Sequence, residues 1–208
     1  MNLASLDTTK LQFQLLKQLP GLAAQLRMAP PVRQKIARYD ANVKLGGVLV
    51  LLYPKSNIWH LLLMQRTADG GTHSGQISFP GGKYDASDGT ITYTAIRECY
   101  EEMGIAQHQY RVLGNLTPLY IPPSNFLVTP TLAIAHARPN LIPNRSEVNE
   151  VIEVPLHELF ANKTEAEVMR SDNKTLSMRA PVYVLADGRY IWGATAMMLS
   201  ELEVLVGM

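Results

Sequence analysis

The chain has little cysteine, no long apolar run and almost no net charge, and each shortage excludes a class of protein. Cys99 is the single cysteine, so the chain can form neither an internal disulfide nor a zinc site built from several thiolates. The longest apolar run, residues 45–53, is far shorter than the roughly 20 residues that span a bilayer. We therefore expect a soluble, cytoplasmic protein with no membrane partner.

The charges are balanced along the chain as a whole. The chain has nineteen basic and eighteen acidic residues, which gives a formal net charge of +1. Such a chain has no global field that would attract nucleic acid, so we expect no nucleic-acid partner and only local recognition of phosphate. A homodimer is left open, because the composition does not decide it.

The length and composition are those of one compact domain. The chain has 208 residues, of which 47% are hydrophobic, and this is enough to bury a sizeable core. Residues 10–19 place leucines on one helical face, and Pro20 and Gly21 end the pattern. We expect residues 1–40 to form an N-terminal helical extension of a domain that covers residues 41–208.

Alternation of apolar stretches with turn residues predicts the other elements. Strands are expected at residues 44–53, 58–66, 111–119, 126–137 and 148–154, the first two as a hairpin. Further hairpins are expected from 168–170 with 176–179 and from 182–185 with 190–192. Helices are expected at 92–104, 157–160 and 194–206. Sheet elements on both sides of a central helix predict an α/β sandwich with a mixed or antiparallel sheet.

The central helix carries an acidic face. Glu98, Glu101 and Glu102 are spaced three and four residues apart, so their carboxylates share one side of the helix. Like charges at this spacing repel one another unless a cation neutralises them, and magnesium or manganese ions prefer carboxylate oxygens. A diphosphate substrate would suit such a site. The alternative is a solvated acidic face, which is the commoner outcome for an isolated pattern of this kind.

The surroundings of this pattern favour the metal site. The three glutamates lie within the sequence RECYEEMG, and Gly81 and Gly82 precede this sequence. The stretch from Gly82 to Ile105 resembles the Nudix box. Asp88 stands where that box usually has glutamate, with one extra residue before Arg97. The resemblance implies a Nudix-type α/β/α sandwich with a mixed sheet and a catalytic loop-helix-loop motif, which would make the chain a pyrophosphohydrolase.

The same resemblance implies roles for individual residues. Glu98 and Glu102 would be ligands of a magnesium or manganese ion, and Glu101 a further ligand or a water-orienting group. The carbonyl of Gly82 would be another ligand. Arg97 would orient the carboxylates through charge-assisted hydrogen bonds. From the residues themselves, Glu98 or Glu101 is the candidate base that assists attack by water.

The sequence HSGQISFPGG, from His73 to Gly82, resembles the coenzyme A diphosphatase branch of that family. The resemblance implies coenzyme A or an acyl derivative as the small-molecule substrate, cleaved to 3′,5′-ADP and a phosphopantetheine. Thr67 and the pair Gly70-Gly71 depart from that branch, so ADP-ribose or a dinucleotide is kept as an alternative. A nucleotide-binding sensor without activity is the non-enzymatic alternative, although its usual mark would be the loss of box carboxylates.

Other residues are candidates for substrate binding. Arg66 could grip a phosphate or form a surface ion pair, and His73 could touch a phosphate or be a structural loop residue. Tyr120 and Phe126 flank a proline-rich loop, where they could stack on an adenine or pack in the core. Cys99 lacks any sign of an activating base and is expected to be core packing.

Overall fold

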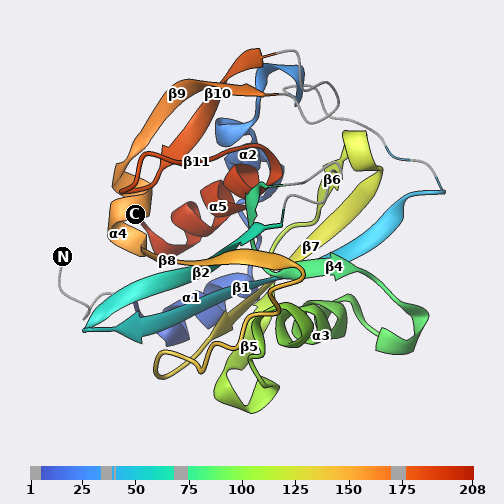
Figure 1. Ribbon diagram of the computed structural model, residues 1–208, viewed down its shortest axis with the longest axis vertical. Helices are drawn as coiled ribbons and strands as arrows, with labels where there is room; N and C mark the ends of the chain where they lie inside the picture. The colour runs from blue at the N-terminus through green and yellow to red at the C-terminus, as the bar shows by residue number, and fades with distance from the viewer. Residues whose placement is uncertain (1–5, 34–38, 40, 68–74, 170–176) are drawn as a thin grey trace.

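A computed structural model describes residues 6–33, 39, 41–67, 75–169 and 177–208 (Figure 1). His73 and the Gly70-Gly71 pair, singled out above, lie outside the described residues. None of the helices in these ranges is long and apolar enough to cross a membrane.

A mixed sheet of eight strands forms the centre of the described structure. Its main path runs β3-β2-β1-β7-β5, while β4 pairs with β1, β6 with β7 and β8 with β2. The central strands β1 and β7 are parallel and the other pairs are antiparallel, as expected for a mixed sheet. The strands are β1 (Lys44–Lys55), β2 (Ile58–Arg66), β3 (Ile77–Ser78), β4 (Gly81–Lys83), β5 (Arg111–Asn115), β6 (Leu119–Ile121), β7 (Phe126–Ile134) and β8 (Val148–Pro155).

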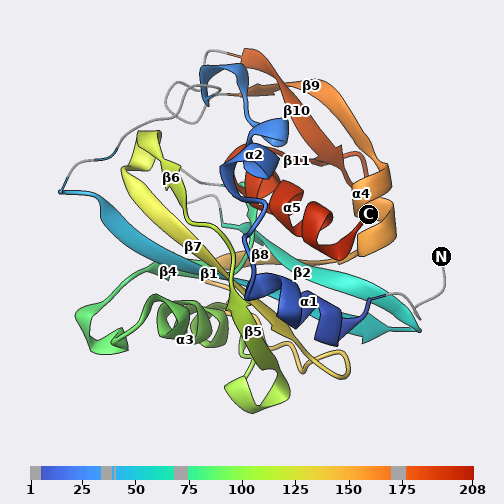
Figure 2. The ribbon, with the colours of Figure 1, turned by 180° about the vertical axis from the view of Figure 1, so that it is seen from behind.

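Helices cover both faces of this sheet, so the predicted sandwich is confirmed (Figures 1 and 2). One face carries α3, and the other carries α1 and α5, beyond which lies a second sheet of three strands. The helices are α1 (Thr8–Leu15), α2 (Gly21–Gln25), α3 (Ile91–Met103), α4 (Leu156–Ala161) and α5 (Gly193–Val206), and the outer strands are β9 (Lys163–Met169), β10 (Ser177–Val184) and β11 (Tyr190–Ile191). Short 3-10 turns lie at Leu26–Met28, Pro31–Arg33, Ala86–Asp88, Gln107–Gln109 and Pro122–Ser124.

Strand β1 is apolar on both sides because both of its sides are covered. Successive side chains of a strand point to opposite faces. Leu49 and Leu51 accordingly pack with Cys99 of α3, whereas Val50 packs in the other core with Leu199 of α5. Complete burial of each such leucine or valine contributes about 1.5–3 kcal/mol to folding. Cys99 is fully buried in this packing.

The N-terminal segment contributes to the same core as the sheet. Leu11 and Met28 belong to the core cluster on the α5 side. Glu201 of α5 is fully buried, and its carboxylate accepts hydrogen bonds from Gly21 N at 3.0 Å and Gln25 Nε2 at 3.0 Å. It also accepts from Thr117 Oγ1 at 2.6 Å, and it thereby joins α2 to the connection between β5 and β6.

Several predicted elements are wrong in extent. The strand expected at 111–119 divides into β5 and β6, because the register shifts near Gly114 and Thr117 turns toward Glu201. The described residues of two segments expected in separate hairpins, 177–179 and 182–184, are joined in one strand, β10. In the described structure, β11 pairs only with the last residues of β10, so the edge of β10 beside Pro181 is unpaired on that side. Proline is tolerated at such an edge, because it has no backbone N–H to donate. The N-terminal helix ends at Leu15, short of residue 19.

Candidate active site

Helix α3 has clear signals at both ends. The Thr90 side chain caps its start by accepting a hydrogen bond from Tyr93 N at 3.2 Å. Gly104 ends it in the left-handed conformation, with φ of 68°, and donates its backbone N–H to Tyr100 O at 2.9 Å. The predicted helix at 92–104 is thus correct within about a residue, and the acidic face lies on regular helix.

Strand β4 lies directly against this acidic face. The Gly81 amide donates to Glu102 Oε2 at 2.8 Å. A β-carbon on Gly82 would overlap the carboxylate of Glu98, and one on Gly81 would overlap the backbone of β1. The glycine pair therefore permits close approach within a strand.

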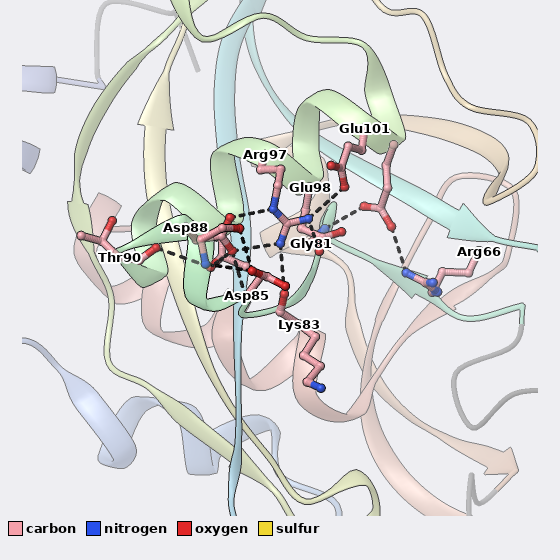
Figure 3. A network of polar contacts seen from close by, with 12 residues as sticks. Arg66, Gly81, Lys83, Asp85, Asp88, Thr90, Arg97, Glu98 and Glu101 are labelled. Carbon is pink, nitrogen blue, oxygen red and sulfur yellow. Dashed lines mark hydrogen bonds and ion pairs between the residues drawn. The ribbon is translucent and has the colours of Figure 1, made fainter.

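Arg97 is the hub of the charged network (Figure 3). Its Nη1 donates to Glu98 Oε1 and to Glu101 Oε2, each at 2.9 Å. Its Nη2 donates to the carbonyl of Lys83 at the end of β4, at 3.1 Å. The guanidinium therefore holds two of the three glutamates of the box in place and ties them to β4.

Asp88 in turn holds Arg97. Its carboxylate accepts from Arg97 Nε at 2.7 Å and from Nη2 at 3.0 Å. Thr94 Oγ1 donates to it at 2.8 Å, and the backbone N–H of Asp85 at 3.1 Å. The hydrogen bonds from Arg97 keep the pKa of this carboxyl well below its usual range, despite its burial. Asp88 is shorter than the glutamate usual at this place in the box and is separated from Arg97 by one extra residue, yet its carboxylate still accepts two hydrogen bonds from Arg97.

Glu102 is the most deeply buried glutamate of the cluster. It is 1% exposed, and its Oε1 accepts a hydrogen bond from Arg66 Nη1 of β2 at 3.0 Å. Burial raises its pKa to about 7, and the Gly81 amide and Arg66 act in the opposite direction. Burial also raises the pKa of Glu98. Arg66, expected at a strand end, thus belongs to the carboxylate cluster itself.

Sequence reasoning missed a further acidic residue, Glu147. It lies in the turn before β8, and its charge contributes to raising the pKa of both Glu98 and Glu102. The turn is fixed to α3 by a hydrogen bond from Asn144 N to Glu102 O at 2.8 Å. An acidic residue in a polar loop carries no pattern of its own, so only the fold shows that Glu147 lies near enough to act on the cluster.

Comparison with known proteins decides the family. Residues 44–172 match the model of the NUDIX domain. This chain belongs to the Nudix family. It is 34% identical over 183 residues to "Uncharacterized Nudix hydrolase NudL" of Pectobacterium atrosepticum, an alignment that covers 88% of this chain and 90% of the relative. It is 33% identical over 162 residues to the human "Mitochondrial coenzyme A diphosphatase NUDT8", covering 77% of this chain and 68% of the relative.

A solved structure agrees with this assignment at the level of fold. The alignment with the crystal structure of a MutT/nudix family protein from Enterococcus faecalis covers 98% of this chain and 75% of that protein's chain, with a TM-score of 0.52. Its sequence identity of 17% supports the fold alone. The chain is therefore a Nudix hydrolase of the branch that includes NudL and NUDT8.

The donor chemistry of this Nudix hydrolase fits a divalent ion. In the described structure, no three acidic, cysteine or histidine side chains converge closely enough to enclose an ion, because arginines hold the carboxylates instead. The carboxylates nevertheless outnumber the two guanidinium groups near them. Hard cations prefer such oxygen donors, and an excess of negative charge favours their binding. The cluster consists of Asp88, Glu98, Glu101, Glu102, Glu147, Arg66 and Arg97.

The two aromatic candidates are not brought together on one surface. Tyr120 pairs with Leu127 in the register of β6 and β7, whereas Phe126 pairs with Ile121. Adjacent register positions point to opposite faces of a sheet. The centroid of the Tyr120 ring lies 5.5 Å from that of the Tyr39 ring, and the backbone carbonyl of Tyr120 accepts a hydrogen bond from the Arg33 guanidinium. The centroid of the Phe126 ring lies 5.6 Å from the Lys44 ammonium.

Proposed function

We propose that this Nudix hydrolase cleaves the diphosphate bond of a nucleoside diphosphate derivative, namely coenzyme A or an acyl-coenzyme A. The products would be 3′,5′-ADP and 4′-phosphopantetheine or its acyl form. The observation that carries the proposal is the surplus of carboxylates between α3 and β4, held by Arg97 and Arg66. The name of the human relative and the sequence HSGQISFPGG support the choice of substrate.

We assign the metal site to residues of the box. Glu98 and Glu102 would be ligands of magnesium or manganese, with the Gly82 carbonyl as another ligand and Glu101 as a further ligand or water-orienting group. A bound divalent ion supplies positive charge beside the phosphate oxygens. Arg97 keeps Glu98 and Glu101 on one side of the helix, so that their carboxylates are in place before the ion arrives.

Substrate binding is assigned to residues around this cluster. Arg66 lies beside Glu102 and would contact a phosphate of the substrate while it keeps that carboxylate oriented. Tyr120 and Phe126 are kept as proposed contacts for the nucleotide from the sequence; because they lie on opposite faces of the sheet, one bound nucleotide would contact only one of them. His73 is kept as a proposed phosphate contact from the sequence alone.

Two alternatives follow from the sequence. Thr67 and Gly70-Gly71 depart from the coenzyme A branch, and these departures favour ADP-ribose or a dinucleotide as the second choice of substrate. A sensor without activity is disfavoured because Glu98, Glu101 and Glu102 are all present. A cytoplasmic location and a homodimer stay predictions.

A substrate panel tests the proposal. The purified protein would be incubated with coenzyme A, dephospho-coenzyme A, ADP-ribose and diadenosine polyphosphates in the presence of magnesium or manganese. Mass spectrometry would identify the products. We expect the highest kcat/KM for coenzyme A species. A clear preference for ADP-ribose or a dinucleotide would overturn the coenzyme A assignment, and cleavage of none of these compounds would overturn the proposed hydrolysis.

A further inference from the structure

Strand β4 lies between groups of opposite charge. A β-carbon on Gly82 would overlap the carboxylate of Glu98, so position 82 faces α3 and the carboxylate cluster. Successive residues of a strand point to opposite faces, so Lys83 points away from the cluster. Figure 3 shows the Lys83 side chain extending away from the carboxylates. The carboxylates and the Lys83 ammonium thus lie on opposite sides of a single strand.

Lys44 and Phe126 lie on the same face as Lys83. Gly46 of β1 is the register partner of Lys83, and partners across a ladder share a face. A β-carbon on Gly46 would lie 3.2 Å from Cδ1 of Phe126 and 2.9 Å from the carbonyl oxygen of Gly82. Lys44 lies two residues before Gly46, and its ammonium is 5.6 Å from the centroid of the Phe126 ring. The two lysines are therefore diagonal neighbours on adjacent strands, a spacing that long side chains can bridge.

Lys44, Lys83 and Phe126, together called the lysine site, carry positive charge without a counter-charge. Among the described residues, neither lysine forms an ion pair with an aspartate or glutamate, whereas Lys55 at the other end of β1 is paired with Glu153. Both lysines are exposed. A cation–π contact at an exposed site is weak, so the Lys44 ammonium can leave the ring for an anionic partner. Two ammonium groups beside an aromatic ring fit a nucleoside that carries a phosphate monoester, because lysine binds phosphate and bases stack on aromatic rings.

We propose that Lys44 and Lys83 bind the 3′-phosphate on the adenosine half of the substrate, while Phe126 contacts the adenine. The inference rests on the proposed function, in which the residues of the box hold the diphosphate. In coenzyme A only the ribose separates the diphosphate from the 3′-phosphate. The Phe126 ring and the Gly82 carbonyl, a proposed metal ligand, both border Gly46. The lysine site would therefore select coenzyme A over dephospho-coenzyme A, which has a hydroxyl in place of that phosphate.

The decisive measurement is the ratio of kcat/KM for coenzyme A to kcat/KM for dephospho-coenzyme A. Loss of folded protein or of metal affects both substrates alike, so the ratio isolates recognition of the 3′-phosphate. We expect the ratio to fall by about tenfold in Lys44→Met and in Lys83→Met, since each change removes a charge-assisted hydrogen bond. Lys44→Arg keeps the charge and should keep most of the ratio. Added salt should lower the ratio of the wild type, because exposed charges are screened.

Lys17→Met is the matched control. The Lys17 ammonium lies 4.4 Å from the centroid of the Phe13 ring, which is the same kind of contact, at the end of α1. Helix α1 packs on β5 and α5 and has no part in the lysine site. We expect Lys17→Met to leave kcat/KM for both substrates, and therefore the ratio, unchanged.

Two further measurements separate the phosphate from the base. Phe126→Leu should raise KM for both substrates and leave the ratio near that of the wild type, because both substrates carry adenine. Calorimetric titration with 3′,5′-ADP, 2′,5′-ADP and AMP measures binding without turnover. The wild type should bind 3′,5′-ADP most tightly, and a variant with both Lys44→Met and Lys83→Met should bind 3′,5′-ADP and AMP about equally.

Each possible result decides between the two proposals. An unchanged ratio in both lysine variants, with coenzyme A still cleaved, would overturn the lysine site and leave the proposed hydrolysis standing. A wild type that cleaves coenzyme A and dephospho-coenzyme A equally well would do the same, and tighter binding of 2′,5′-ADP would overturn the assignment to a 3′-phosphate. A wild type that cleaves no diphosphate would overturn the proposed function, and the titrations with 3′,5′-ADP and AMP would still confirm or overturn the lysine site.

Discussion

Glu102 and Glu201 are both fully buried glutamates on helices, yet their surroundings differ completely. Within the described part of the chain, the carboxylate of Glu201 accepts hydrogen bonds only from uncharged donors of Gly21, Gln25 and Thr117. Glu102 accepts from one backbone amide and Arg66, and it lies close to other carboxylates. Burial alone therefore does not mark a functional carboxylate. The surplus of like charge around Glu102 is the feature that supports the proposed metal role, because a bound cation would offset it.

The largest effect is expected from Glu102→Gln, which tests the functional side of this comparison. The amide keeps the volume of the side chain but loses its charge. Charge stabilisation by a divalent ion is worth several kcal/mol, so we expect kcat/KM to fall by about a thousandfold. Steady-state kinetics with magnesium would measure the loss, and circular dichroism would check the fold. Activity near that of the wild type would contradict the metal assignment.

The opposite outcome is expected from Glu201→Leu, which should damage stability and spare the chemistry. The change leaves the donors of Gly21, Gln25 and Thr117 buried without an acceptor. We expect the free energy of unfolding to fall by about 3–5 kcal/mol, as measured by urea denaturation. The folded fraction should keep its kcat. Glu201→Gln, which retains one acceptor oxygen, is the control and should cost less. A folded Glu201→Leu protein without activity would assign Glu201 a part in catalysis.

An intermediate effect is expected from Asp88→Asn, which weakens the support of Arg97. The amide cannot accept both hydrogen bonds from the guanidinium with the strength of a carboxylate. Loss of a residue that orients ligands typically costs about 10–100-fold, so kcat/KM should fall within that range. Kinetics at several Mn²⁺ concentrations would show whether excess metal recovers part of the loss. An unchanged kcat/KM would mean that Glu98 and Glu101 hold Arg97 by themselves.

The same comparison explains what the sequence could and could not predict. The helix of the box follows from its spacing and from Gly104, so Glu98, Glu101, Glu102 and Arg97 could be named in advance. These residues are close in the sequence. Glu147 is brought to the cluster only by the pairing of β8 with β2, which no local pattern encodes.

Errors in the predicted fold have a similar origin. The connection between β5 and β6 reads as one strand locally, but it is broken by contacts with Glu201 and Pro130, which are distant in the chain. The roles of Tyr120 and Phe126 could not be separated for the same reason, because the face on which each lies depends on the register of β6 and β7. Local propensity therefore predicts the elements, and tertiary partners decide their ends and faces.

The smallest effect concerns the stability of the metal-free protein as a function of pH. Desolvation by burial raises the pKa of Glu102 to about 7, above the value near 4.5 of an unburied glutamate. The folded protein then binds this proton more tightly than the unfolded chain. Stability from this group is fully present below about pH 4.5 and is lost as the pH rises to about 7. Glu102→Gln has no such proton and should not show this loss.

Thermal unfolding in the presence of a chelator, at about pH 5 and about pH 8, would measure the difference. The Tm of Glu102→Gln minus that of the wild type should be larger at the higher pH by a few degrees, since about 1 kcal/mol corresponds to 2–4 °C in a chain of this size. Glu98 is present in both proteins and largely cancels. Added Mn²⁺ should raise the Tm of the wild type more than that of the variant, because the ion stabilises only the folded state that binds it. The same Tm difference at both pH values would show that Glu102 is already ionised at the lower pH. The carboxylate of Glu102 would then resemble that of Glu201, whose hydrogen-bond donors stabilise its charge without a cation.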